Sequence, residues 1–246
     1  NNAIWLDADR DGWLDLYVGS YWFCCIAGSP AGKAAHPTIR NRLYRNFEGT
    51  FLEDITEITG LDIRFDLIGG GTQGEMGSGD FNNDGWPDIY LGAGDTGLSH
   101  LFLNDQTGTF WEASGDFISI GVALHAFDLG DVDNDGDLDL ATAGKLWINQ
   151  VAATPKNKWI ALTLEGDGKK VNRSAIGAIA RIKLKDRVLT RQVESGTGEG
   201  NQNQVRLHFG LGAHEGPVDV EITWLGAGKR MVKGLFAGKV HKVTFK

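Results

Sequence analysis

The sequence predicts an all-β fold, and three observations carry this prediction. An acidic loop of the form Asp-x-(Asp/Asn)-x-Asp-Gly-x-x-Asp occurs three times, and each copy runs directly into a short alternating apolar stretch. A second motif, Leu-aromatic-x-Asn, follows each loop. In residues 154–246 apolar and polar side chains alternate, as in the series Val218, Val220, Ile222 and Trp224. All three patterns are typical of short strands separated by tight turns.

The acidic loops place oxygen-bearing side chains at regular positions in residues 7–15, 80–88 and 131–139. A glycine at position 6 allows a sharp turn, so that side chains at positions 1, 3, 5 and 9 and the main-chain carbonyl of position 7 can converge. The predicted metal ligands of the three loops are Asp7, Asp9, Asp11, Trp13 and Asp15; Asp80, Asn82, Asp84, Trp86 and Asp88; and Asp131, Asp133, Asp135, Asp137 and Asp139.

These hard oxygen ligands favour Ca²⁺ over Mg²⁺, which loses its waters reluctantly and requires stricter octahedral geometry. Clustered carboxylates also repel one another, by roughly 4 kcal/mol per pair at ~4 Å and an effective dielectric constant of about 20. We therefore expect up to three bound Ca²⁺ ions. An EF-hand is excluded because position 12 is Val18, Leu91 or Thr142 instead of Glu. Metal-free Asp/Asn/Gly turns are the alternative, but ordinary turns need no carboxylate at every second position.

The second motif completes the repeat. It occurs at residues 43–46, 101–104 and 146–149, and Gly-Thr-Phe follows the first two copies at 49–51 and 108–110. The order of loop, strand and two further strands predicts a small antiparallel sheet repeated in tandem, as in a propeller blade. About three blades make only a partial propeller, because closed propellers typically have 4–8. We expect the missing blades to come from an absent N-terminal portion or from neighbouring copies, giving a homo-oligomer or filament-like assembly through the open edges.

The charge distribution predicts two domains. Residues 1–153 contain 24 Asp/Glu against 7 Lys/Arg, a net charge of −17, whereas residues 154–246 contain 8 against 17, a net charge of +9. We assign residues 1–153 to the propeller repeats and residues 154–246 to a small β-sandwich. The basic half either recognises an anionic glycan or packs against the acidic half, and alternation of its Lys and Arg with apolar residues favours packing.

Residues 1–150 resemble FG-GAP/VCBS-type calcium-binding propeller repeats, through the loops together with residues 41–51 and 56–61. The remainder resembles the ASPIC/UnbV domain of secreted bacterial proteins and of the cartilage acidic protein family. The segments that carry this second resemblance are residues 158–160, 172–178, 207–212 and 220–224. After Trp224 the chain reads Leu-Gly-Ala-Gly, where that family usually continues Pro-Ser-Gly. The resemblance implies an extracellular or periplasmic protein.

No catalytic constellation is found, because Gly-x-Ser-x-Gly, His-Glu-x-x-His and kinase signatures are absent. We therefore expect no enzyme, no nucleic-acid partner and no membrane span. Cys24 and Cys25 are adjacent and form no CxxC motif. The sequence favours a secreted calcium-binding scaffold or adhesion module with a protein or glycan ligand. A non-catalytic accessory part of an extracellular carbohydrate-active or redox enzyme is the alternative.

Overall fold

The computed structural model describes residues 3–19, 40–62, 76–92, 99–113, 127–142, 144–149, 157–196 and 202–246. Within these ranges the regular structure is β-strand, apart from one 3-10 turn, η2 (Thr56–Ile58), so the predicted all-β class is confirmed. No helix in the described ranges is long and apolar enough to cross a membrane. Cys24, Cys25 and the predicted domain boundary at residues 153–154 lie outside the described residues, and the boundary stays a prediction.

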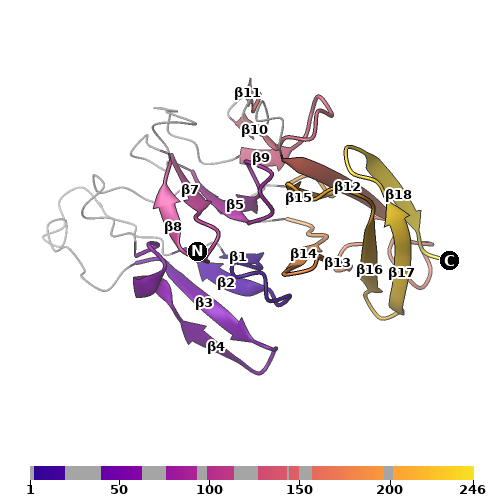
Figure 1. The fold of residues 1–246 in the computed structure, drawn as a ribbon, viewed down its shortest axis with the longest axis horizontal. Coiled ribbons are helices and arrows are strands. Elements are labelled where there is room, and N and C mark those ends of the chain that lie inside the picture. The colour runs from indigo at the N-terminus through magenta and orange to yellow at the C-terminus, as the bar shows by residue number, and fades with distance from the viewer. Residues whose placement is uncertain are drawn as a thin grey trace, which may run out of the picture.

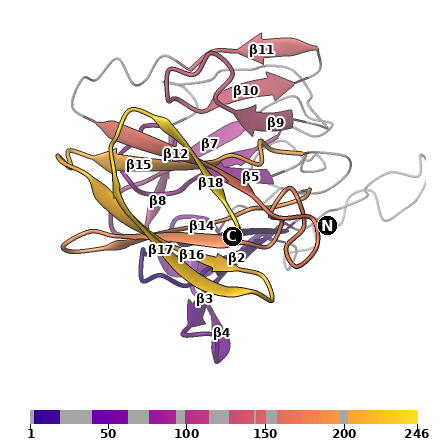
Figure 2. The same cartoon turned by 90° about the vertical axis from the view of Figure 1, so that its right-hand side faces the viewer.

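Three antiparallel sheets form the N-terminal half, each built around one acidic loop. Figure 1 shows them in indigo to pink, and Figure 2 shows the three stacked in chain order. The first sheet contains β1 (Ala3–Leu6), β2 (Asp15–Val18), β3 (Arg42–Phe47) and β4 (Phe51–Asp54). The second contains β5 (Met76–Gly79), β6 (Asp88–Leu91), β7 (His100–Asn104) and β8 (Phe110–Glu112). The third contains β9 (Phe127–Gly130), β10 (Asp139–Thr142) and β11 (Lys145–Trp147).

The sheets pack face to face in a propeller-type arrangement. One apolar cluster joins Ile4, Tyr17 and Leu43 of the first sheet to residues of the second, including Ile89 and Phe102. A second cluster joins the opposite face of the second sheet to the third. Its members include Tyr90, Leu101, Leu103, Phe127, Leu129 and Leu140. Because alternate residues of a strand face opposite sides, the second sheet can bury both of its faces.

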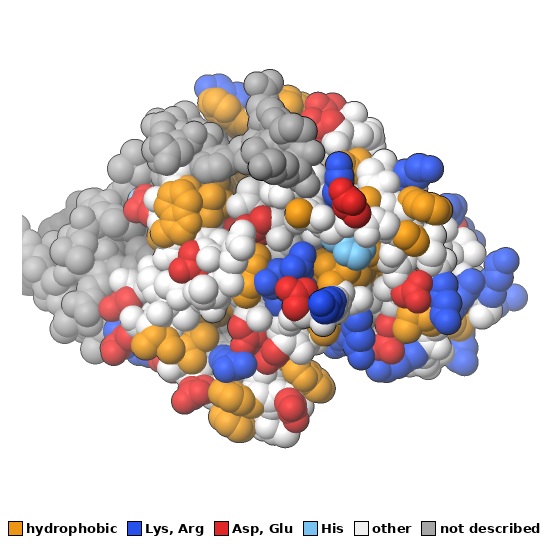
Figure 3. Space-filling model, viewed as in Figure 1, with side chains coloured by type: hydrophobic (Ala, Val, Ile, Leu, Met, Phe, Trp, Pro, Cys, Tyr) orange, Lys and Arg blue, Asp and Glu red, His pale blue; other side chains and the backbone are white. Residues whose placement is uncertain are grey.

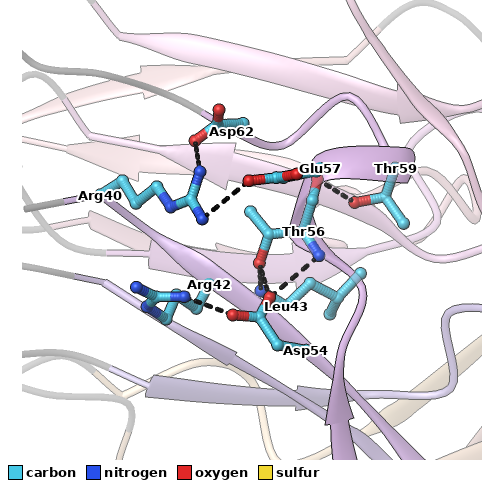
Figure 4. A network of polar contacts seen from close by, with 8 residues as sticks. All are labelled: Arg40, Arg42, Leu43, Asp54, Thr56, Glu57, Thr59 and Asp62. Atoms are coloured by element: carbon cyan, nitrogen blue, oxygen red, sulfur yellow. Dashed lines mark hydrogen bonds and ion pairs between the residues drawn. The ribbon is translucent and has the colours of Figure 1, made fainter. Parts of the chain in front are cut away.

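A polar network fixes the turn that follows β4 (Figure 4). Asp54 accepts hydrogen bonds from both the main-chain N–H and the hydroxyl of Thr56, and Thr56 Oγ1 accepts one from Leu43 N at 2.9 Å. Thr59 O then accepts a hydrogen bond from Phe110 N at 2.7 Å. The segment after the first sheet is therefore attached to an outer strand of the second.

The C-terminal unit, residues 157–246, consists of two sheets around one core. One sheet has the order β15 (Leu207–Gly212), β12 (Lys158–Glu165), β18 (Val240–Thr244). The other has the order β14 (Val188–Gln192), β13 (Ile179–Lys183), β16 (Val218–Trp224), β17 (Gly228–Leu235). The predicted alternation holds on β16, where Val218, Val220, Ile222 and Trp224 are all buried in the core between the two sheets.

The C-terminal unit packs directly on the acidic loops, which agrees with the expectation that the basic half packs against the acidic half. Val188 N donates a hydrogen bond to Arg10 O at 3.3 Å, and Gly212 N donates one to Asn83 O at 2.9 Å. Figure 3 shows Lys and Arg side chains gathered over β16 to β18, while Asp and Glu side chains lie mainly over the first sheets. One side of each loop is thus covered by the C-terminal unit, while Trp13 and residues 132–135 stay exposed.

Candidate metal centres

The position-9 aspartate anchors each loop at the start of a strand. In loop 1 (residues 7–15), Asp15 accepts hydrogen bonds from Ala8 N at 2.9 Å and from Asn46 N at 2.8 Å. The same pair of bonds recurs in loop 2 (residues 80–88) and loop 3 (residues 131–139). There the partners are Phe81 N and Asn104 N with Asp88, and Val132 N and Asn149 N with Asp139. A carboxylate oxygen has two lone pairs, so each can still face a cation.

The turn of each loop requires two left-handed residues. In loop 1, Arg10 at position 4 has φ 59° and Gly12 at position 6 has φ 98°. Positions 4 and 6 are left-handed in the other loops too, at Asn83, Gly85, Asn134 and Gly136. Glycine adopts such angles without steric cost, which explains its recurrence at position 6. The turn brings Gly12 N to 3.3 Å from Asp7 Oδ1, so the first carboxylate points inward.

The three loops differ in how closely their carboxylates gather. Asp7, Asp9 and Asp11 of loop 1 place one ligand atom each within 4.8 Å of one another, as do Asp131, Asp133 and Asp139 of loop 3. Asp15, Asp135 and Asp137 are not in these groups. Among the described residues, loop 2 forms no such group of three acids. Its position 3 is Asn82, whose side-chain N–H donates to Asp84 Oδ2 at 3.3 Å.

Several loop oxygens are buried and make no hydrogen bond, which fits a cation. Asp7 Oδ2 and both carboxylate oxygens of Asp131 have no hydrogen-bond partner among the described residues. Burial raises the pKa of Asp7 and of Asp80 to about 7, because a desolvated carboxylate is costly to ionise. Arginines supply part of the missing positive charge. Arg45 lies 2.6 Å from Asp9, whereas Arg206 stays 3.8 Å from Asp131.

Position 4 of one loop contacts position 6 or 7 of the next. The Arg10 guanidinium lies 3.3 Å from the ring centroid of Trp86, which is only 7% exposed. Asn83 Nδ2 donates to Gly136 O at 3.0 Å and to Asp137 Oδ1 at 2.8 Å. Consecutive loops are therefore in contact, and the three form one connected arc. The sequence did not indicate that position 4 makes these contacts.

The asparagine of the second motif also links consecutive loops. Asn104 Nδ2 donates to Ala8 O in loop 1 at 2.9 Å, and Asn149 Nδ2 donates to Phe81 O in loop 2 at 2.9 Å. Both acceptors occupy position 2 of the preceding loop. Asn46 donates instead to Leu14 O of its own loop, at 2.9 Å. The motif was visible in the sequence. Its acceptors in the preceding loops were not, because they lie 96 and 68 residues away from Asn104 and Asn149.

Replacing Asn104 by Ala is expected to destabilise the chain by about 3 kcal/mol, because it leaves the buried Ala8 carbonyl without its donor and the main-chain N–H groups of Gln106 and Gly108 without their acceptor. Asn46→Ala is the matched control, because Asn46 donates to its own loop and not to a preceding one. Its loss should cost about 1 kcal/mol. Urea unfolding of both variants measures the difference. Equal losses would show that the contact between loops contributes nothing.

His208 is a further residue whose role the sequence did not show. Its Nε2 donates to Gly136 O of loop 3 at 2.9 Å, although the two residues lie on different halves of the chain. Burial lowers the pKa of His208 to about 4, so the ring is neutral. The structure places it at a contact between the C-terminal unit and a candidate metal loop.

Comparison with known families supports this architecture. Residues 80–142 match the family described as FG-GAP-like repeat. Residues 168–245 match the family described as ASPIC and UnbV. A search of curated proteins finds no match. The first match spans the whole of loop 2 and loop 3 and ends with β10, and the second covers most of the C-terminal unit.

Proposed function

We propose that this chain, which contains an FG-GAP-like repeat followed by an ASPIC and UnbV domain, is a calcium-stabilised scaffold or adhesion module that binds a protein or glycan. The observation that carries the proposal is the connected set of three acidic loops, of which loops 1 and 3 gather three carboxylates each and contain buried carboxylate oxygens without a hydrogen bond. We place the module outside the cell or in the periplasm, where millimolar Ca²⁺ saturates weak sites. Its role is structural, without catalysis of its own.

We further infer that the first three sheets are blades and that the last two form a β-sandwich. Apolar clusters between consecutive sheets support the blades, because neighbouring propeller blades bury their faces against each other. The single core shared by the two C-terminal sheets supports the sandwich. In this assignment the sandwich covers the loop-bearing side of the blades.

The ligand sets follow the loop positions. Side chains at positions 1, 3, 5 and 9 and the carbonyl oxygens of Trp13, Trp86 and Asp137 would hold the ions. Bound Ca²⁺ would supply positive charge that offsets carboxylate desolvation and repulsion. Loop 2, with Asn82 in place of a carboxylate, is expected to bind more weakly than loop 1.

Calorimetric titration of the full chain with Ca²⁺ tests this function. We expect binding at up to three sites, with the weakest assigned to loop 2, and much weaker binding of Mg²⁺. Asp7→Asn should remove or weaken one site because it neutralises a position-1 carboxylate, whereas Asp105→Asn, on an exposed turn, should leave all sites intact. A chain that binds no Ca²⁺ at millimolar concentration would contradict the proposal.

The face of the first sheet that carries Trp5 supports an assembly, because among the described residues no other sheet packs on it; it is called the free face below. Trp5, Leu16 and Tyr44 are paired neighbours across this sheet, and Trp5 is 45% exposed. The equivalent face of the second sheet, with Ile89 and Phe102, is buried against the first. The free face therefore fits another sheet of the same repeat. In a solution of this chain alone, that sheet comes from a second copy.

Sedimentation velocity tests the assembly. We expect the chain to sediment as a dimer or larger species and Trp5→Glu to return it to a monomer, because a buried charge at the contact is costly. Trp111→Glu is the matched control, since Trp111 is 46% exposed on β8 and away from this face, and it should leave the association unchanged. A monomeric wild-type chain would contradict this assembly.

A further inference from the structure

The C-terminal unit contacts the turn of every acidic loop through main-chain carbonyls. Arg181 Nε donates to Gly12 O of loop 1 at 3.0 Å, and His208 Nε2 donates to Gly136 O of loop 3 at 2.9 Å. Loop 2 accepts from two donors. These are Gly212 N to Asn83 O at 2.9 Å and Asn157 Nδ2 to Asn82 O at 2.8 Å. The acceptors belong to positions 3, 4 and 6, whose carbonyls are outside the predicted ligand set.

The packing is close enough to fix the shape of the turns. A Cβ atom on Gly136 would lie 1.9 Å from the Trp159 indole, and one on Gly12 would lie 3.4 Å from Val188. The carbonyls at position 6 meet their donors while Gly12 and Gly136 are in the left-handed turn. The same turn points the position-1 carboxylate inward. The same loop conformation therefore serves both the docking of the C-terminal unit and the convergence of the carboxylates on the ion.

We infer, on the premise that the loops bind Ca²⁺ as proposed, that Arg181 and His208 are positioning residues for loop 1 and loop 3. They hold the turn in its ion-binding conformation from outside the ligand set. The C-terminal unit thereby raises the affinity of the loops for Ca²⁺. Because such coupling is reciprocal, bound Ca²⁺ strengthens the docking of the C-terminal unit to the same degree.

The charge of the C-terminal half, taken alone, would lower the affinity of the loops for Ca²⁺. The C-terminal half is basic, with Arg206 beside Asp131, and its positive charge opposes the binding of a cation. At Gly136 O the effect of fixing the loop outweighs this repulsion, because His208 is uncharged and donates a short hydrogen bond to a carbonyl. Long-range repulsion is screened within about 8 Å at physiological ionic strength. The coupling should therefore persist in high salt, whereas a charge effect should not.

Calcium titration of the full chain and of three variants tests the positioning role. His208→Ala is expected to weaken one of the sites about fivefold or more without touching a ligand. His208→Gln should restore most of the affinity, because its amide N–H can reach the place of Nε2. The matched control is His241→Ala. His241 Nε2 also donates to a main-chain carbonyl, Phe236 O, at 2.8 Å, but within the C-terminal unit, so its loss should change no site.

Hydrogen exchange of the Val193 amide, bonded to Ala178 O inside the C-terminal unit, shows whether each variant is folded. If His208→Ala fails this check, Arg181→Leu replaces it, with Arg230→Leu as control, since Arg230 donates to Thr244 O on the far side of the unit. Folded variants that bind Ca²⁺ as tightly as the wild type would overturn the positioning role while leaving calcium binding intact. A wild-type chain without Ca²⁺ binding would overturn the proposed function and this role together.

Discussion

Asp88→Ala is expected to lower the free energy of unfolding of the Ca²⁺-saturated chain by about 4 kcal/mol. Asp88 is completely buried, and its two oxygens accept the hydrogen bonds of Phe81 N and Asn104 N at 2.9 Å each. Removing them leaves two buried N–H groups without acceptors, at about 1–3 kcal/mol each. The loop also loses its position-9 ligand. Urea unfolding with and without a chelator separates these losses, because only the ligand part depends on Ca²⁺.

The control is Asp167→Ala. Asp167 accepts hydrogen bonds from Lys169, Lys170 and Val171, each at 2.9 Å, but on an exposed turn far from the loops. Water can replace those bonds, so the loss should be small and insensitive to Ca²⁺. An Asp88→Ala chain as stable as Asp167→Ala would show that the position-9 aspartate does not hold the loop to its strand.

Gly136→Ala is expected to cost about 4 kcal/mol, from the left-handed conformation together with overpacking, and to displace the C-terminal unit from loop 3. Gly136 has φ 98°, and a Cβ atom there would overlap the Trp159 indole at 1.9 Å. Because the overlap is this severe, the indole must leave its present position, and its contact with loop 3 is lost. A red shift of the tryptophan fluorescence, together with a lower urea midpoint, should report the displacement.

Gly144→Ala provides the matched control for backbone strain. Gly144 also has a positive φ, 77°, but nothing lies within 4 Å of the place where its Cβ would be. The left-handed conformation alone costs about 1 kcal/mol for alanine. If both variants lose the same stability, the strain of the turn explains the effect, and the contact between Gly136 and Trp159 is not needed for docking.

The sequence allowed prediction of the features that are local in the chain. Strands β2, β6 and β10 begin at Asp15, Asp88 and Asp139, as the loop pattern indicated, because a position-9 carboxylate bonded to nearby N–H groups fixes the strand start. The burial of alternate residues on β16 follows from their period of two. These features depend on neighbours within one repeat or one strand.

Contacts between distant residues could not be predicted in this way. Trp13 and Trp86 share position 7, yet Trp13 is 40% exposed and Trp86 is covered by Arg10 of another loop. Likewise, nothing in the pattern around His208 indicates that its acceptor is Gly136, 72 residues away. Periodicity shows which side of a strand is apolar, but it does not show which surface covers it.

In the proposed function, Ca²⁺ in the acidic loops holds the sheets and the C-terminal unit together. Thermal unfolding of the full chain in millimolar Ca²⁺ and in excess chelator tests it most directly. With free Ca²⁺ about thirtyfold above Kd, each site contributes roughly 2 kcal/mol, so three sites should raise Tm by about 10 °C or more. Equal Tm values in Ca²⁺ and in chelator would contradict the claim.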